Sequence, residues 1–263
     1  MICCVSLMLL FQSPGYSQTL RVISVANTND ARLGAGFSAN AKSLRDYAAL
    51  VASVSGLTLE MKEIIGTDYT CERIMESVKS LSAQDTDVIL FYHSGHGISP
   101  AENQASTSAS QYPSFDCERD GVDESNIAQL PNLEDISKIL HGKGARLTLI
   151  AADSCNVVLP RATQVFAARG FMQARIKAMF RDFKGYVLMS SSVRGQYSWY
   201  TSDGGLFTNR LIDILRAPDA QKQEDLWADA IKAIQADIYV NAGGVKTLQR
   251  PQLVSRLTYD QLR

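Results

Sequence analysis

The chain has 263 residues, of which 46% are hydrophobic, and a formal net charge of −1 at pH 7. This length and apolar content suffice for one sizeable core, so we expect a single α/β domain. The near-neutral charge provides no broad basic field of the kind that neutralises phosphates, and nucleic acid is therefore not expected as a partner.

The N-terminal segment, residues 1–17, is predicted to be a signal peptide that precedes one domain over residues 18–263. Residues 2–11 form a short apolar run, which Pro14 and small residues follow. Such a run is too short for a membrane-spanning helix, which needs about 20 residues, but it suits a signal sequence. We expect cleavage after Ser17, a secreted or periplasmic protein and no stable membrane insertion. No basic residue precedes the run, which leaves open an upstream start or a buried first strand.

Apolar runs alternate with helical patterns along the rest of the chain. Strands are predicted at residues 19–26, 57–64, 87–93, 145–152 and 185–191. Apolar spacing predicts helices around 44–54, 74–81 (capped by Thr70) and 224–240. Near-continuous apolar strands between helices are typical of a mostly parallel sheet with helices on both faces, which carries its functional groups at the carboxyl ends of the strands.

Three cysteines remain after removal of the predicted signal peptide: Cys71, Cys117 and Cys155. In an oxidising compartment an odd number indicates one free thiol, so Cys71 could pair with Cys117 while Cys155 stays reduced. Three unrelated buried thiols are the alternative.

Two of the predicted strands end in residues that can carry out nucleophilic catalysis. "VILFYHSGHG" (88–97) ends in His96 between two glycines, and "LTLIAADSCNVV" (147–158) contains Cys155, 59 residues after His96 (155 − 96). An imidazole beside a thiol takes its proton and later delivers it to a leaving amine. Each residue alone could be an ordinary core residue, and a zinc site with His93 is a rival. His93 is expected on the opposite face of the strand and to be structural.

The motifs "FYHSGHG" and "DSC" resemble the His and Cys boxes of caspase-like cysteine peptidases, particularly metacaspases and bacterial caspase homologues. Further similar segments are "ANTNDARLGAG", "DGVDES", "SSSVRGQYSW", "GGLFTNRLIDIL" and "QRPQL". The resemblance implies a three-layer caspase-like α/β fold, with His96 as general acid/base and Cys155 as nucleophile. It places the oxyanion hole at the backbone N–H groups of Gly97 and Cys155. No third acidic residue that orients the histidine is evident.

Substrate preference depends on Asp153 in the resemblance, because a metacaspase-like Asp-x-Cys box places a carboxylate in the S1 pocket. An acidic pocket selects Arg or Lys and rejects anionic side chains. Asp30 is the candidate for a second S1 acid. As alternatives, Asp153 caps a following helix and Asp30 forms a turn with Asn29. Tyr197, Ser198 and Trp199 either line the substrate groove or pack in the core.

The resemblance also suggests calcium, since the acidic run Asp116, Glu118, Asp120, Asp123 and Glu124 corresponds to a metacaspase segment. A solvated acidic loop is the alternative, and no cofactor is expected to be required. Basic residues that follow the Cys box are candidate self-cleavage points unless they pack in a helix; they are Arg161, Arg169, Arg175, Lys177 and Arg181.

The sequence therefore predicts a cysteine endopeptidase, a monomer, that acts on peptides or proteins after Arg or Lys. A caspase-fold enzyme that cuts after Asp is one alternative, but no "QAC" box is present. A non-catalytic binding or scaffold module is the other.

Overall fold

The computed structural model describes residues 18–99, 110–117, 129–156, 173–217, 222–242 and 245–260. The predicted signal peptide lies outside these residues. No helix within the described part of the chain is both long and apolar enough to cross a membrane.

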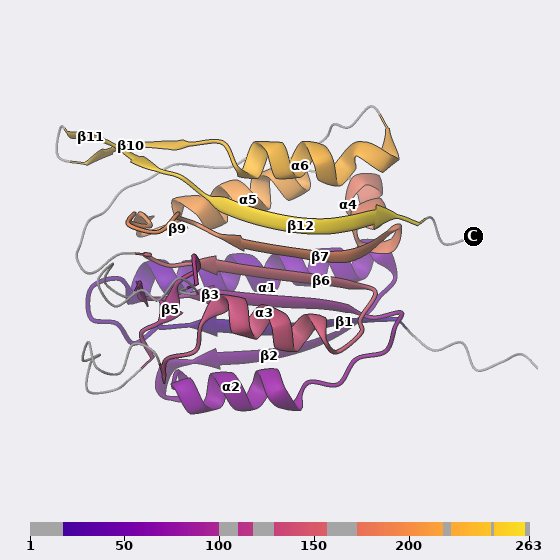
Figure 1. Ribbon diagram of the computed structural model, residues 1–263, viewed down its shortest axis with the longest axis horizontal. Coiled ribbons are helices and arrows are strands. Elements are labelled where there is room, and N and C mark those ends of the chain that lie inside the picture. The colour runs from indigo at the N-terminus through magenta and orange to yellow at the C-terminus, as the bar shows by residue number, and fades with distance from the viewer. Residues whose placement is uncertain are drawn as a thin grey trace, which may run out of the picture.

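A six-stranded sheet forms the centre of the molecule, in the order β12-β7-β6-β3-β1-β2 (Figure 1). Its strands are β1 (Thr19–Ala26), β2 (Thr58–Ile65), β3 (Val88–Ser94), β6 (Leu147–Asp153), β7 (Phe183–Ser190) and β12 (Gln252–Tyr259). All neighbours pair in parallel except β12, which runs antiparallel to β7. The mostly parallel sheet predicted from the apolar runs is confirmed.

Helices cover both faces of this sheet. They are α1 (Gly34–Ser55), α2 (Cys71–Ser80), α3 (Leu133–His141), α4 (Gln173–Arg181), α5 (Leu206–Arg216) and α6 (Leu226–Ile234). In β1, Leu20 and Val22 pack in the core shared with α1, α4, α5 and α6, whereas Ile23 and Val25 pack with α2 and α3. Successive side chains of a strand point to opposite faces, so one apolar strand supplies both cores. In Figure 1, α3 lies in front of the strands and α1 behind them.

Short hairpins gather at the edge where the parallel strands end, on the left in Figure 1. They pair β4 (Gly97–Ile98) with β5 (Ser114–Phe115), β8 (Tyr200–Thr201) with β9 (Gly204–Gly205), and β10 (Ile238–Ala242) with β11 (Val245–Gln249). The remaining elements are the 3₁₀ turns η1 (Gly66–Asp68) and η4 (Gln223–Asp225).

One predicted element is wrong over its last six residues, 235–240. The helix predicted over 224–240 begins as η4 and α6 but ends at Ile234, and residues from Ile238 form β10 instead. The run Ile238, Tyr239 and Val240 consists of strand-forming residues, and it pairs with β11 across the hairpin. Apolar residues at helical spacing do not show where a helix ends and a hairpin strand begins, so the change at Ile238 could not be predicted from the spacing.

Cys71 and Cys117 form a disulfide, with their Cα atoms 5.1 Å apart. The alternative of three unrelated thiols is therefore wrong. Among the described residues Cys155 is the free cysteine. The bond fixes the first residue of α2 to the segment that follows β5, which lies at the carboxyl edge of the sheet.

Candidate active site

The His and Cys boxes follow two adjacent parallel strands. Ser94, the last residue of β3, pairs with Asp153, the last residue of β6. His96 and Cys155 each lie two residues beyond that pair (96 − 94 and 155 − 153). The sheet therefore brings both boxes to its carboxyl edge, where His96 and Cys155 lie the same number of residues beyond the strand ends.

A close backbone approach joins the two boxes. A Cβ atom added at Gly97 would lie 2.3 Å from the carbonyl oxygen of Cys155 and 2.8 Å from the Ser154 Cβ. No side chain fits there, which explains the glycine after His96. The structure thus brings Gly97 against Cys155, the two residues whose N–H groups the resemblance assigns to the oxyanion hole.

The His96 side chain is 28% exposed and is held on two sides. Its Nε2 atom lies 2.8 Å from Oδ2 of Asp30, and the Phe37 ring meets the imidazole edge-on with centroids 5.6 Å apart. Asp30 lies in the turn that precedes α1 and is 15% exposed. The sequence indicated no acidic partner for His96, so the contact with Asp30 is a correction to that expectation.

The Cys155 thiol is half-buried and points toward a carbonyl. Its Sγ donates a hydrogen bond to the carbonyl oxygen of Ser198, at a distance of 3.7 Å. Burial raises the pKa of the thiol to about 11. Among the described residues, the thiol therefore donates to this carbonyl and not to His96. The geometry is that of a resting, protonated thiol that is bonded to a carbonyl.

Asp153 is fully buried below the site, and donors surround its carboxylate. Oδ1 accepts from the Ser198 hydroxyl at 2.5 Å, and Oδ2 accepts from the N–H and the hydroxyl of Thr208, at 3.0 Å and 2.5 Å. Tyr200 donates to the Asp153 carbonyl. Thr208 is the third residue of α5, so the carboxylate caps a helix, although α5 begins about 50 residues after Asp153 rather than directly behind it. Ser198 and Thr208 could not be predicted as its partners, because they lie 45 and 55 residues further along the chain.

An open pocket of about 600 Å³ lies beside His96. Its lining includes Asp30 and Asp116, and it does not include Asp153; the remaining lining residues come mainly from the loop after β1, from η1 and from Tyr69 and Cys117. Among the described residues that line it, none is Arg or Lys. The pocket therefore combines negative charge with the histidine.

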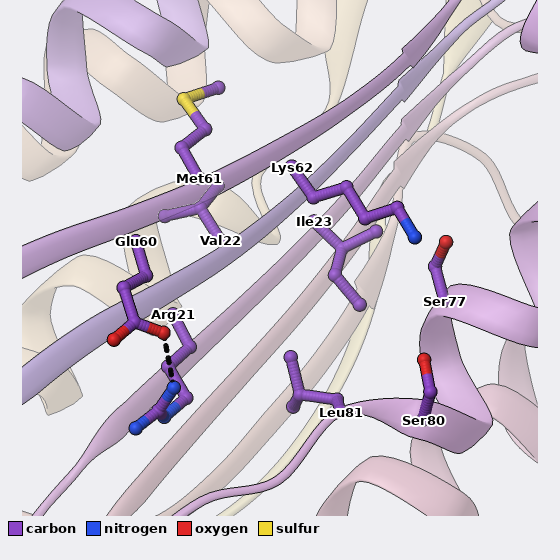
Figure 2. A pocket seen from close by; sticks show the side chains of 9 residues that line it. All are labelled: Arg21, Val22, Ile23, Glu60, Met61, Lys62, Ser77, Ser80 and Leu81. Carbon is purple, nitrogen blue, oxygen red and sulfur yellow. Dashed lines mark hydrogen bonds and ion pairs between the residues drawn. The ribbon is translucent and has the colours of Figure 1, made fainter.

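A second pocket, of about 220 Å³, lies between β2 and the end of α2. Figure 2 shows it flanked by the ion pair of Arg21 with Glu60. Both residues lie near the beginnings of β1 and β2, so this pocket is at the opposite end of the strands from His96.

His93 is structural, in agreement with the sequence. It is fully buried and stacks on Phe115 with ring centroids 3.6 Å apart, while its Nε2 lies 2.9 Å from the Tyr69 hydroxyl. Burial lowers its pKa to about 3, so the ring is neutral. No cluster of three metal-ligating side chains occurs in the part of the chain that the structure describes.

The other sequence predictions divide between described and undescribed residues. Trp199 packs with Leu206 and Val240 in a small core, whereas Ser198 contacts both Asp153 and the thiol. In α4, Arg175 is buried and Arg181 donates to the Ser55 carbonyl, as the packed-helix alternative requires, whereas Lys177 of the same helix is exposed. Residues of the acidic run after Cys117, together with Arg161 and Arg169, lie outside the described residues.

Comparison with known proteins agrees with this geometry. The family model of the caspase domain matches residues 34–261. The chain belongs to the caspase domain family. This family consists of cysteine peptidases, whose substrates are peptides. Caspase-1 from Spodoptera frugiperda has a similar structure, with 15% identity and a TM-score of 0.50 over 91% of this chain and 88% of that chain. This likeness concerns the caspase fold alone, and no curated protein matches.

Proposed function

We propose that the protein is a cysteine endopeptidase that uses His96 and Cys155 as a catalytic dyad. One observation carries the proposal: the two residues lie equally far beyond the paired ends of β3 and β6, on segments whose backbones touch at Gly97. A nucleophile and a proton carrier at one sheet edge are what acyl transfer requires.

In the proposed reaction His96 accepts the proton of the Cys155 thiol, and the thiolate attacks the carbonyl carbon of the peptide bond. The oxyanion of the tetrahedral intermediate faces the N–H groups of Gly97 and Cys155, each of which contributes about 3 to 4 kcal/mol. His96 then protonates the leaving amine as the C–N bond breaks. Water hydrolyses the resulting thioester and restores the thiol.

We propose that substrate binding activates the Cys155 thiol, because the raised pKa keeps this thiol protonated in the free protein. A thiol that donates to the Ser198 carbonyl is not yet poised for attack. Occupation of the groove would rotate Sγ away from this carbonyl and toward His96, since apo sites often have loose catalytic hydrogen bonds.

We further propose cleavage after Arg or Lys. The pocket beside His96 has an acidic lining, for which a cationic side chain is the complementary guest. Asp116 is the carboxylate proposed to face that side chain, because Asp30 is engaged by His96. Cleavage after Asp would need a cationic residue in the pocket. Asp153 does not line this pocket, and burial raises the pKa of its carboxyl. Direct contact with a substrate would require it to exchange its bonds to Ser198 and Thr208.

Export to a secreted or periplasmic location is also proposed. A disulfide between Cys71 and Cys117 persists in an oxidising compartment and is rare in a reducing one, which supports the function of residues 1–17 as a signal peptide. We propose a monomer in that compartment.

Cleavage of a peptide library varied at P1 tests the proposal, with the chain from Gln18 and with its Cys155→Ala variant. We expect turnover after Arg and Lys in the parent chain and none in the variant, at equal thermal stability. The assay is run with Ca²⁺ and with a chelator, because Asp116 begins the acidic run that is the candidate calcium segment.

Other outcomes would select the alternatives. Preference for Asp at P1 would contradict the assignment of the pocket. A folded chain that neither cleaves peptides nor reacts with a peptidyl ketone at Cys155 would instead favour a scaffold role.

A further inference from the structure

The imidazole of His96 and the carboxylate of Asp30 form the closest polar contact in the site. They come from segments 66 residues apart, and the Nε2 to Oδ2 distance is 2.8 Å. Both side chains are mostly shielded from water, at 28% and 15% exposure. A contact of this length between partly buried groups is a well-formed, charge-assisted hydrogen bond whenever the ring is protonated.

The carboxylate is rigidly held from its other side. Oδ1 of Asp30 accepts from the backbone N–H groups of Arg32 and Leu33, at 2.9 Å and 2.6 Å. The Asp30 carbonyl accepts from the N–H of Gly34, the first residue of α1. A Cβ atom at Gly34 would lie 2.6 Å from the Thr28 carbonyl oxygen, which shows how tightly this turn is closed.

The same segment also supplies the second contact of the ring. Phe37, one turn into α1, meets His96 at an interplanar angle of 89°. Asp30 and Phe37 together fix the direction in which the imidazole points. This pairing of a carboxylate with an apolar ring edge positions the histidine without blocking its exposed side.

Asp30 is ionised at neutral pH. Burial by itself would raise its pKa, but the N–H groups of Leu33 and Arg32 and the bond to His96 outweigh it, so that the net pKa is lowered. A carboxylate at this site accepts a hydrogen bond and cannot donate one. Nε2 of His96 must therefore carry a proton, and Nδ1 is the ring nitrogen that is free to accept another.

We propose that Asp30 is a positioning residue that acts through His96: it selects the tautomer with a free Nδ1 and stabilises the imidazolium that forms when Nδ1 takes the Cys155 proton. This deepens the proposed function and rests on it. It also separates Asp30 from the S1 role expected of it, because two backbone donors and the imidazole already occupy most of its acceptor sites.

Other titratable groups lie around His96 and must be kept constant in a test. They are Asp116 from the segment after β5, Tyr69 before α2, His93 from β3 and Cys155 after β6. His93 is neutral and Tyr69 keeps its proton, because burial raises the pKa of its hydroxyl well above 10. Asp30 is therefore the carboxylate with a direct bond to the ring.

Asp30→Asn is the decisive variant, because its amide oxygen can still accept from the turn while its NH₂ group faces Nε2. The ring must then present Nε2 as acceptor, which places a proton on Nδ1. We expect kcat to fall by about 10² to 10⁴-fold with KM for an Arg substrate nearly unchanged. Asp30→Glu, which keeps the charge, should recover part of this loss. Asp68→Asn, which removes an exposed charge from η1, is the matched control.

Alkylation of Cys155 by iodoacetamide gives a second measurement that no S1 pocket influences. In the chain from Gln18, Cys155 is the free thiol among the described residues. Loss of the Asp30 charge disfavours the thiolate–imidazolium pair, so the rate profile should move by about 1 pH unit to higher pH in Asp30→Asn. The profile of Asp68→Asn should superimpose on that of the parent chain.

A third measurement does not depend on catalysis at all. Nitrogen-15 NMR of the His96 ring should find the proton of the neutral form on Nε2 in the parent chain and on Nδ1 in Asp30→Asn. An unchanged tautomer and alkylation profile, with a raised KM for Arg substrates, would overturn the proposal and return Asp30 to the S1 pocket. If the parent chain cleaves no peptide, the proposed function fails, while the tautomer still decides the role of Asp30.

Discussion

At the scale of single residues, Asp153 matters for stability as well as for any substrate contact. Its carboxylate accepts from Ser198 Oγ and from two groups of Thr208, all of them buried. A buried donor without an acceptor costs about 1–3 kcal/mol, so Asp153→Ala should lower the free energy of unfolding by about 3 kcal/mol or more. Urea unfolding measures this loss. Asp153→Asn, which keeps one acceptor, should lose less, and a parent-like midpoint for Asp153→Ala would contradict the network.

Asp87 predicts a dependence of stability on acid. Its Oδ1 accepts from the N–H of Thr19 at 2.9 Å, and its Oδ2 accepts from Arg21 Nε at 2.7 Å and from the N–H of Gln84 at 2.9 Å. Burial alone would raise its pKa, but the Gln84 N–H and Arg21 outweigh burial and lower it below 3.8. The unfolded chain therefore binds this proton more readily than the folded chain.

The stabilisation by Asp87 should accordingly be complete above the unfolded pKa near 4 and be lost as the pH falls through the lower folded pKa. In urea unfolding at pH 7, Asp87→Asn should have a lower free energy of unfolding than the parent chain, and this difference should shrink toward pH 3. A difference that stays constant over this range would show that the charge of Asp87 contributes nothing to stability. Asp229→Asn, in the first turn of α6 and exposed, serves as control.

Residue types at strand ends were enough to predict the dyad candidates but not their partners. His96 and Cys155 follow apolar runs, and the glycine after His96 marks a close approach. The sequence predicts Asp30 as a second S1 acid, with a turn residue as the alternative, and the turn is present. Its bond to His96 depends on where α1 brings that turn in space, 66 residues away along the chain, and no local pattern encodes this distance.

At the scale of elements, the disulfide links α2 to the wall of the pocket beside His96. Cys71 and Cys117 are 46 residues apart, and Cys117 lines the pocket. Loop-closure entropy for this separation corresponds to about 4 kcal/mol at 25 °C. The double variant Cys71→Ser with Cys117→Ser should lose about this much unfolding free energy, as measured in urea without reductant.

Reductant supplies the control for that prediction. Dithiothreitol should destabilise the parent chain toward the value of the double variant and leave the double variant unchanged. Equal stability of the two chains without reductant would show that the bond does not constrain the unfolded state.

Elements with a strong local signal were predicted well. The predicted strand at 19–26 is β1 residue for residue, and the helix capped by Thr70 is α2, in which the Thr70 side chain accepts from the Arg73 N–H. The edge strand β12 was not predicted, because it alternates between half-buried and exposed residues and pairs only along β7. Its existence depends on a long-range partner rather than on its own apolar content.

At the scale of the whole molecule, the residues that stabilise the fold and the candidate catalytic residues lie in different parts of the sheet. Apolar cores fill both faces along the length of the strands, while the loops with His96 and Cys155 and the hairpins gather at the carboxyl edge. The chain can therefore vary its pocket through these loops without disturbing the cores, which is the general advantage of parallel α/β folds.

The surface of the molecule predicts a monomer in solution. Among the described residues, the exposed large hydrophobic side chains are Ile65, Tyr239 and Val254, and they belong to β2, β10 and β12. β2 and β12 are the opposite edges of the sheet, so Ile65 and Val254 do not share a patch. A stable dimer buries about 1,200–2,000 Å² with an apolar centre, which a single exposed valine flanked by the exposed Arg256 does not supply.

Light scattering coupled to size exclusion should give the monomer mass for the chain from Gln18 at micromolar concentration. A dimer mass that reverts to the monomer in Val254→Lys, but not in Tyr239→Lys, would contradict this and identify β12 as the pairing edge.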